Sequence, residues 1–176
     1  LALAAAAGTA TLGFEVVAAR MAALRLGSSL FAWAAVLALF LAGLAAGNLA
    51  LAATAARSRH PILMLGWIEA AAALALGTGA SLLSHPPALP AEGVTPHALF
   101  VLLIGVGPSA FLMGGAFPYF VRLAVREGEI GRVFGRVSAW NTAGGIVGAL
   151  VAPFVLLPVL GPAGAVSVCA GISGLL

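Results

Sequence analysis

Apolar stretches separated by short polar or glycine- and proline-rich connections organise the whole chain. We expect one membrane span in each of the ranges 1–24, 30–56, 62–83, 98–123 and 137–157, and a last one that reaches residue 176. A membrane-crossing α-helix needs about 20 consecutive apolar residues, whereas the strands of a membrane barrel alternate apolar and polar residues. The sequence shows long runs and no such alternation. It therefore predicts an all-α, polytopic membrane bundle of about six transmembrane helices.

Composition supports a bilayer rather than water as the solvent. The chain is 62% hydrophobic and 7% charged, whereas a soluble domain carries about 25% charged residues. Residues 1–10 lack the basic segment of a signal peptide, so we interpret them as part of the first helix. Because the chain opens at Leu1 without a methionine and stops at Leu176 inside an apolar run, we interpret residues 1–176 as a single transmembrane domain, incomplete at one or both ends.

The arginines predict the orientation. All eight basic residues are arginine, and the net charge is +3. The connections after the second and fourth spans carry six of them: Arg57, Arg59, Arg122, Arg126, Arg132 and Arg136. Positive residues favour the cytoplasmic side, so we expect both chain ends in the cytoplasm and a location in the bacterial inner membrane. Arg25 is the exception, and its long side chain is expected to snorkel. The chain contains no stretch of basic residues interleaved with aromatic ones, so the sequence does not indicate nucleic-acid binding.

Two glutamates lie within apolar spans, Glu15 in the first and Glu69 in the third. A charge at the centre of a span costs on the order of 2.5–3.5 kcal/mol on insertion scales, so each should be paired, protonated or directed into the bundle. Arg20 is 140° from Glu15 around a helix and is expected to reach Glu69 instead. Two interpretations stay open: a site that handles protons or cations, and an interhelical bridge that fixes the fold.

Small residues one helical turn apart mark two spans. Gly43 and Gly47 in the second, and Gly144 and Gly148 in the fifth, allow another helix backbone to approach closely. Asn48 is expected to hydrogen-bond across the first of these contacts. Patterns of this kind indicate helix packing more often than substrate binding.

Two prolines, Pro108 and Pro118, are expected to break the fourth span. Broken helices mark binding sites in transporters, and they also occur as plain kinks, so both interpretations stay open. Asn141 begins the fifth span just after Trp140. It is either a polar helix entry or a side chain directed toward the same cavity as Glu15 and Glu69.

The sequence offers no catalytic, cofactor-binding or metal-binding residues. Cys169 is the only cysteine and is interpreted as a small packing residue. His60, His85 and His97 lie in expected loops without the spacing of a metal site. No nucleophile elbow, phosphate loop or nucleotide-binding fingerprint occurs, so we predict no cofactor.

Several segments together resemble the membrane region of the transmembrane spermidine synthase-like proteins, also described as fused major-facilitator/spermidine synthase proteins. The resemblance covers nearly the whole chain in order, at 13–15 with Arg20, 26–29, 40–47, Glu69, 112–118, 135–136, 141–150 and 156–158. In that family an aminopropyltransferase-like or methyltransferase-like domain usually follows. Its glycine-rich cofactor loop is missing here and the chain contains no Asp, so the resemblance implies the membrane half alone.

These observations favour a membrane anchor or a transporter-like module for a small cationic metabolite, without catalysis of its own. The alternative is an accessory structural subunit within a larger membrane assembly. The expected partners are the lipid bilayer and either other membrane proteins or further copies of the chain. An enzymatic role requires a soluble domain beyond Leu176.

Overall fold

The computed structural model describes residues 1–26, 30–84, 96–125 and 130–176, and this part of the chain is helical and contains no strand. The side chains of residues 24–26, and with them Arg25, are outside the description. The elements are α1 (Ala2–Leu26), α2 (Leu30–Arg57), α3 (Pro61–Ser84), α4 (Pro96–Ala124), α5 (Ile130–Val151), the π-helix η1 (Ala152–Leu156) and α6 (Leu157–Leu175). Pro61 and Pro96 each occupy the first position of a helix. Proline is well tolerated there, because the N–H that it lacks would have no hydrogen-bond acceptor within the helix.

Five stretches of the described chain are long and apolar enough to cross a membrane, where six spans were expected. The difference lies at the carboxyl end, because the predicted fifth and sixth spans form one stretch, Ile130–Leu175. Pro153 and Pro158 fall within this stretch, but the helical hydrogen bonding continues through η1. The backbone departs from helical geometry only at Gly161 (φ 68°, ψ 178°), a conformation essentially restricted to glycine.

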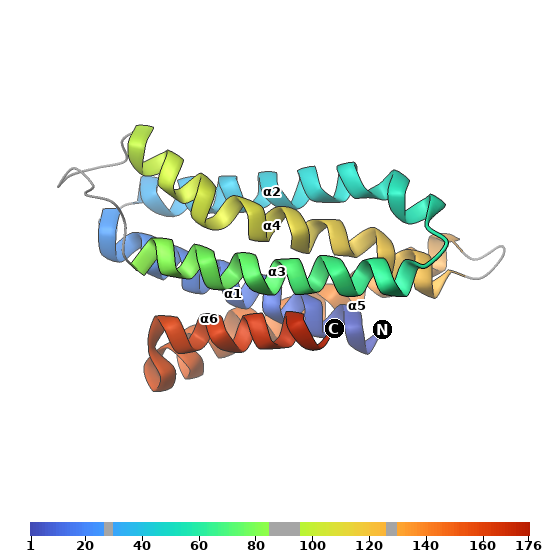
Figure 1. The fold of residues 1–176 in the computed structure, drawn as a ribbon. Helices are drawn as coiled ribbons and strands as arrows, with labels where there is room; N and C mark the ends of the chain where they lie inside the picture. The colour runs from blue at the N-terminus through green and yellow to red at the C-terminus, as the bar shows by residue number, and fades with distance from the viewer. Residues whose placement is uncertain (27–29, 85–95, 126–129) are drawn as a thin grey trace.

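The helices lie alongside one another in a bundle, with the amino terminus and the α2–α3 turn toward the same end (Figure 1). The chain reverses after α5, so α6 returns along α3 and α1 (Figure 1). Two helix pairs dominate the packing: α2 with α4, and α1 with α5. Within each pair the two helices run in the same direction, and the two pairs run in opposite directions (Figure 1). Contacts between the two pairs are sparse.

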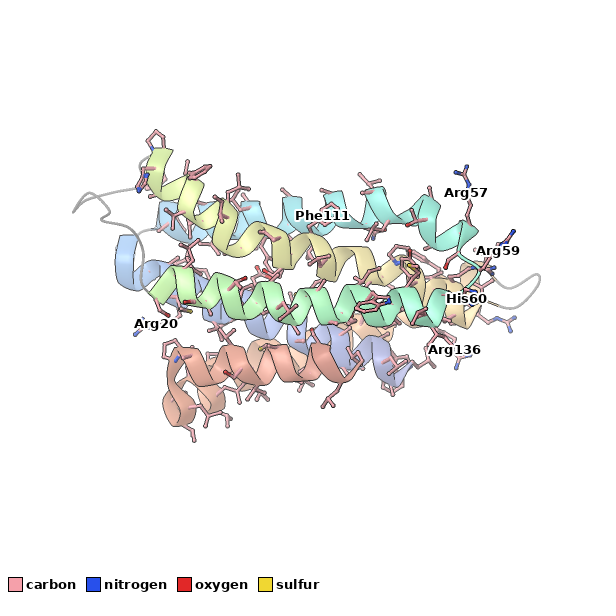
Figure 2. The ribbon with its side chains drawn as sticks, in the orientation of Figure 1. Arg20, Arg57, Arg59, His60, Phe111 and Arg136 are labelled. Carbon is pink, nitrogen blue, oxygen red and sulfur yellow. The ribbon has the colours of Figure 1, made fainter. Side chains whose placement is uncertain are left out.

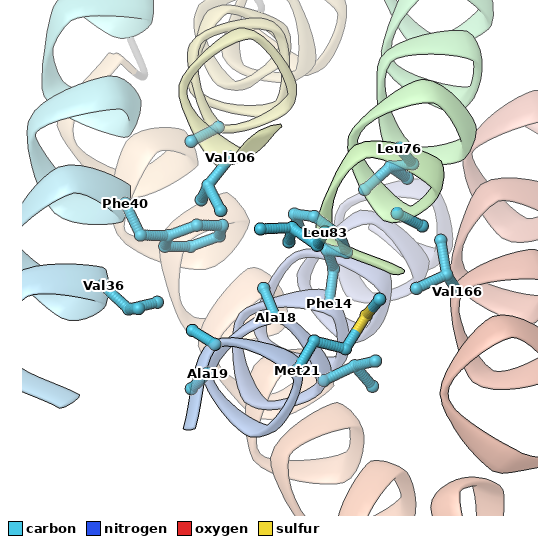
Figure 3. Close-up of a cluster of buried hydrophobic side chains, with 14 of the residues drawn as sticks. Phe14, Ala18, Ala19, Met21, Val36, Phe40, Leu76, Leu83, Val106 and Val166 are labelled. Carbon is cyan, nitrogen blue, oxygen red and sulfur yellow. The ribbon is translucent and has the colours of Figure 1, made fainter. Parts of the chain in front are cut away.

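The larger hydrophobic core lies away from the α2–α3 turn and joins α1, α2, α3, α4 and α6 (Figure 3). Phe14 and Phe40 meet near its centre with ring centroids 6.4 Å apart. Leu76 and Val106 add fully buried aliphatic side chains from α3 and α4. A smaller cluster, which includes Tyr119 and Phe120, fills the opposite end. The outer surfaces of the helices carry many exposed large apolar side chains. Exposed apolar surface on this scale identifies an integral membrane protein.

The two helix pairs share one glycine contact in the same register. In the α1–α5 pair, Gly8 lies against the carbonyl oxygen of Asn141, and in the α2–α4 pair Gly47 lies against that of Phe111. In both pairs a side chain at either glycine would overlap the partner backbone, so only glycine permits the approach.

The equivalence continues along both pairs. Gly144 lies against Ala5 as Gly114 lies against Leu44, and Leu12 covers Gly145 as Leu51 covers Gly115. One constant difference in residue number relates α1 to α2, and another relates α5 to α4, in all of these contacts. The predicted packing glycines lie in these interfaces: Gly43, Gly47, Gly144 and Gly148.

Helix α4 is not broken at Pro108 or Pro118, which corrects the expected interruption. The helix continues through both residues because each proline removes only one donor and neighbouring helices support the backbone. The carbonyl group of Gly114 nevertheless loses its usual donor, since residue 118 has no N–H.

Candidate functional site

A cavity of about 410 Å³ lies between the two helix pairs. Its lining comes from α1, α2, α4 and α5: Ala7, Thr11, Leu41, Leu44, Ala45, Asn48, Met113, Gly114, Phe117, Phe120, Phe134, Ser138 and Asn141. The volume falls within the ~300–1,000 Å³ range of small-molecule sites. The lining itself carries no formal charge and consists of neutral polar groups, aromatic rings and small apolar side chains.

Most of the polar side chains in this cavity have no protein partner. Thr11 is the exception, because its hydroxyl donates to the Ala7 carbonyl at 2.7 Å. Within the described part of the chain, the side chains of Asn48, Ser138 and Asn141 make no hydrogen bond. Ser138 and Asn141 are half-buried, and such polar groups are normally satisfied, so a polar ligand or water is their expected partner. Asn48 is exposed on the cavity wall.

Two further features suit the cavity to an organic cation. The carbonyl freed by Pro118 belongs to Gly114, a residue of the cavity lining, so an acceptor of negative partial charge lies at or near the wall. The rings of Phe117 and Phe134 lie edge to face, with centroids 5.7 Å apart and an interplanar angle of 84°. A cation within about 6 Å of an aromatic centroid is attracted to the ring face, most strongly where water is excluded.

The cavity lies toward the basic end of the bundle. Arg57, Arg59 and Arg136 gather at this end, while Arg20 lies at the opposite end (Figure 2). The cavity residue Asn141 follows Arg136 in α5 by little more than one turn.

Comparison of the chain with protein-family models, with curated proteins and with solved structures finds no match.

Glu15 does not line the cavity, although it lies close to it in the helix. It follows Thr11 by four residues and therefore lies on the same face of α1, one turn farther from the basic end. Its side chain is half-buried. Arg20 is exposed, and among the described residues it forms no ion pair with Glu15 or Glu69. The expected bridge from Arg20 to Glu69 is therefore absent, because the exposed guanidinium lies outside the bundle interior.

Glu69 lies in a different environment from Glu15. It is 2% exposed, on the buried face of α3 between Leu65 and Ala72. Its carboxyl group interacts with Ser173 of α6, a 1% exposed residue whose hydroxyl completes no hydrogen bond of regular geometry. The structure thus brings Asn141 to the cavity and leaves both carboxylates outside its lining.

The other residues singled out in the sequence do not line the cavity. Pro108 lies in an apolar groove on the outer side of the α2–α4 pair, and Pro118 follows directly after the cavity residue Phe117. Cys169 is buried, with its sulfur atom against Gly13. The described part of the chain contains no group of three His, Cys, Asp or Glu residues that could hold a metal ion. His85 lies outside the described residues.

Sequence reasoning missed several cavity residues, namely Thr11, Ser138, Phe117, Phe120 and Phe134. It placed Asn48 across a helix contact, whereas the structure exposes Asn48 on the cavity wall. One signal was available, because Ser138 and Asn141 are three residues apart and so share a helix face. No equivalent pattern in the sequence identifies the aromatic wall.

Proposed function

We propose that this chain is a transporter-like membrane domain that binds a small organic cation in the cavity between its two helix pairs. The observation that carries the proposal is a cavity between sparsely contacting helix pairs, whose lining combines unpartnered polar groups with aromatic rings. The resemblance to spermidine synthase-like membrane regions supports a polyamine as the ligand.

The proposal assigns different roles to the two carboxylates. Glu15, one turn beyond Thr11, supplies negative charge at the inner edge of the cavity once a cation enters. Glu69 is buried next to Ser173 between α3 and α6 and does not line the cavity. This division refines the expectation that both glutamates serve one cation site.

The fold suggests how the site operates. Backbone contact at glycines makes each helix pair a rigid unit, and contacts between the pairs are sparser, so the pairs would tilt about the cavity by repacking the Phe14–Phe40 contact. Rocking of rigid units around a central site is a common transport mechanism. We propose six crossings, with the reversal at Gly161 separating the last two. Both chain ends would then lie at the arginine-rich cytoplasmic side of a bacterial inner membrane.

Spermidine binding to the purified protein tests the proposal, with proteoliposome flux as the second readout. We expect Glu15→Gln and Asn141→Leu each to weaken binding about tenfold, since each removes a charge-assisted or polar contact. Glu69→Gln is the matched control and should bind spermidine as the parent does. Equal affinity in all variants contradicts the proposal. Absence of binding, together with a stoichiometric copurifying membrane protein, would favour the accessory-subunit alternative.

One observation favours that alternative. The outer face of α3 carries small residues at Gly66, Ala70 and Gly77, and nothing in the described chain packs against either glycine. A partner helix could approach this face as closely as α4 approaches α2.

A further inference from the structure

A second cavity lies at the turn between α2 and α3, separate from the site between the helix pairs. It has a volume of about 450 Å³ and is lined by Ala53, Thr54, Arg57, Ser58, Arg59, His60, Met64 and Tyr119. Two of these residues are arginines and none is acidic. Neither arginine forms an ion pair with another residue of the described chain.

The start of α3 borders this cavity, which His60 and Met64 line. The first helical hydrogen bond of α3 runs from the Met64 N–H to the His60 carbonyl, at 3.1 Å. The N–H groups of Ile62 and Leu63 precede that bond and have no acceptor within the helix. A helix amino terminus favours an anion through these free donors and through the helix dipole. Together with Arg57 and Arg59, it makes the cavity complementary to a phosphate group.

The opposite wall is neutral and internally bonded. Tyr119 of α4 donates from its hydroxyl to Thr54 Oγ1 at 3.2 Å, and Thr54 donates to the Leu51 carbonyl at 2.7 Å. The first of these hydrogen bonds links α4 to α2 and the second holds Thr54 in place, so this wall of the cavity is fixed before a ligand binds. The Ser58 hydroxyl remains available as a further donor.

The surroundings identify the source of the phosphate. Exposed apolar side chains continue along α3 from the cavity, at Ile62, Leu63 and Trp67. A large exposed tryptophan near one end of a membrane helix is typical of the interface between headgroups and hydrocarbon. Figure 2 shows Arg57, Arg59 and His60 together at the end of the bundle. The basic cavity therefore borders the lipid-facing surface of α3, so a phospholipid can place its headgroup in the cavity while its acyl chains stay in the bilayer along this surface.

We infer that the α2–α3 turn is a binding site for the headgroup of an anionic phospholipid. The phosphodiester lies between the guanidinium groups of Arg57 and Arg59 at the amino terminus of α3, and the acyl chains follow the outer face of α3. Basic pockets at the cytoplasmic ends of membrane helices bind anionic headgroups by this chemistry.

The test measures retention of phosphatidylglycerol by the purified full chain in neutral detergent, by native mass spectrometry. Phosphatidylcholine and inorganic phosphate serve as separate competitors. We expect the double variant Arg57→Gln and Arg59→Gln to lower phosphatidylglycerol affinity at least about tenfold, because charge-assisted hydrogen bonds to the phosphate are lost. Neither phosphatidylcholine nor millimolar phosphate should displace the bound lipid.

The matched control is the double variant Arg122→Gln and Arg136→Gln, which removes the same charge from exposed positions outside the cavity lining. It should change the affinity less than twofold. Equal losses in the two double variants would overturn the inference, since diffuse surface charge would then explain binding. Displacement by inorganic phosphate would equally overturn a lipid site. The single variants Arg57→Gln and Arg59→Gln, each with an unchanged helical circular dichroism spectrum, give the same comparison if the double variant fails to fold.

Discussion

The α1–α5 pair and the α2–α4 pair share a backbone contact and differ at two equivalent side chains. In the first pair, the Thr9 hydroxyl shares its single proton between the carbonyls of Ala5 and Gly144, at 3.0 Å each. The equivalent residue of the second pair is Asn48, which makes no hydrogen bond in the described chain and faces the cavity. The Thr9 hydroxyl is thus bonded within its helix contact, whereas the amide group of Asn48 has no hydrogen-bond partner in the described chain.

Helices α5 and α4 also differ, in whether a backbone carbonyl keeps its helical hydrogen-bond donor. Gly148 of α5 keeps its N–H, so the Gly144 carbonyl retains its helical donor. The equivalent residue of α4 is Pro118, and the Gly114 carbonyl therefore lacks one. The comparison indicates that one helix-packing geometry serves as a scaffold in the α1–α5 pair and as a ligand-facing wall in the α2–α4 pair.

The largest expected effect tests whether the two contacts are equivalent. Gly8→Ala and Gly47→Ala each place a methyl group against a partner backbone carbonyl that cannot move aside. Each should destabilise the fold by about 3 kcal/mol, at the upper end of overpacking costs. Denaturation of the purified protein in mixed detergent micelles, followed by circular dichroism, measures the change.

The controls for these variants are Gly66→Ala and Gly77→Ala in α3, where an added methyl group meets no other atom. They should stabilise the helix by about 0.5–1 kcal/mol, because alanine is the better helix former. A well-tolerated Gly47→Ala beside a damaging Gly8→Ala would break the proposed equivalence of the pairs.

Much of this architecture could be predicted from the sequence. The apolar runs placed α1 to α4 to within a few residues, since run length alone decides which segments can span a bilayer. The spacing of Gly43 and Gly47 marked a packing face but not its partner helix. Pro158, Gly161 and Pro162 predicted a turn before the last segment, and the backbone does leave helical geometry at Gly161. The sequence did not show, however, that helical hydrogen bonding would continue through Pro153 and Pro158.

The cavity was much less predictable. Most of these helices are apolar on all sides, so the sequence does not fix how each is rotated about its axis. That rotation decides whether Glu15, Glu69 and Asn141 meet. The structure brings Asn141 to the cavity and turns Glu69 toward Ser173. Single polar residues within apolar spans could be singled out from the sequence, but the sequence does not show which of them lie side by side.

A smaller effect is expected from restoring the missing donor of α4. Pro118→Ala returns an N–H to the Gly114 carbonyl and makes the α2–α4 pair resemble the α1–α5 pair. We expect stability to rise by about 1 kcal/mol, less than the ~3 kcal/mol of a soluble helix because membrane neighbours partly satisfy the freed backbone. Spermidine affinity should fall several-fold in the binding assay, since the cavity loses an acceptor.

Pro108→Ala is the matched control in the same helix. Pro108 lies in the outer apolar groove rather than the cavity, so its replacement should stabilise α4 without altering spermidine affinity. If both proline variants lower affinity equally, the shape of α4 rather than the Gly114 carbonyl determines binding.

The smallest expected effect separates the scaffold pair from the ligand-facing pair most directly. Thr9→Val removes the hydroxyl that joins α1 to α5 and retains the side-chain volume. Hydrogen bonds between membrane helices average about 0.6 kcal/mol, so a loss of that size in stability is expected, with unchanged spermidine affinity. Asn48→Leu should show the reverse, since its amide makes no bond within the described chain: stability within about 0.5 kcal/mol of the parent and weakened binding. If Thr9→Val impaired binding as much as Asn48→Leu, the α1–α5 pair would belong to the ligand site, and the distinction between the pairs would be wrong.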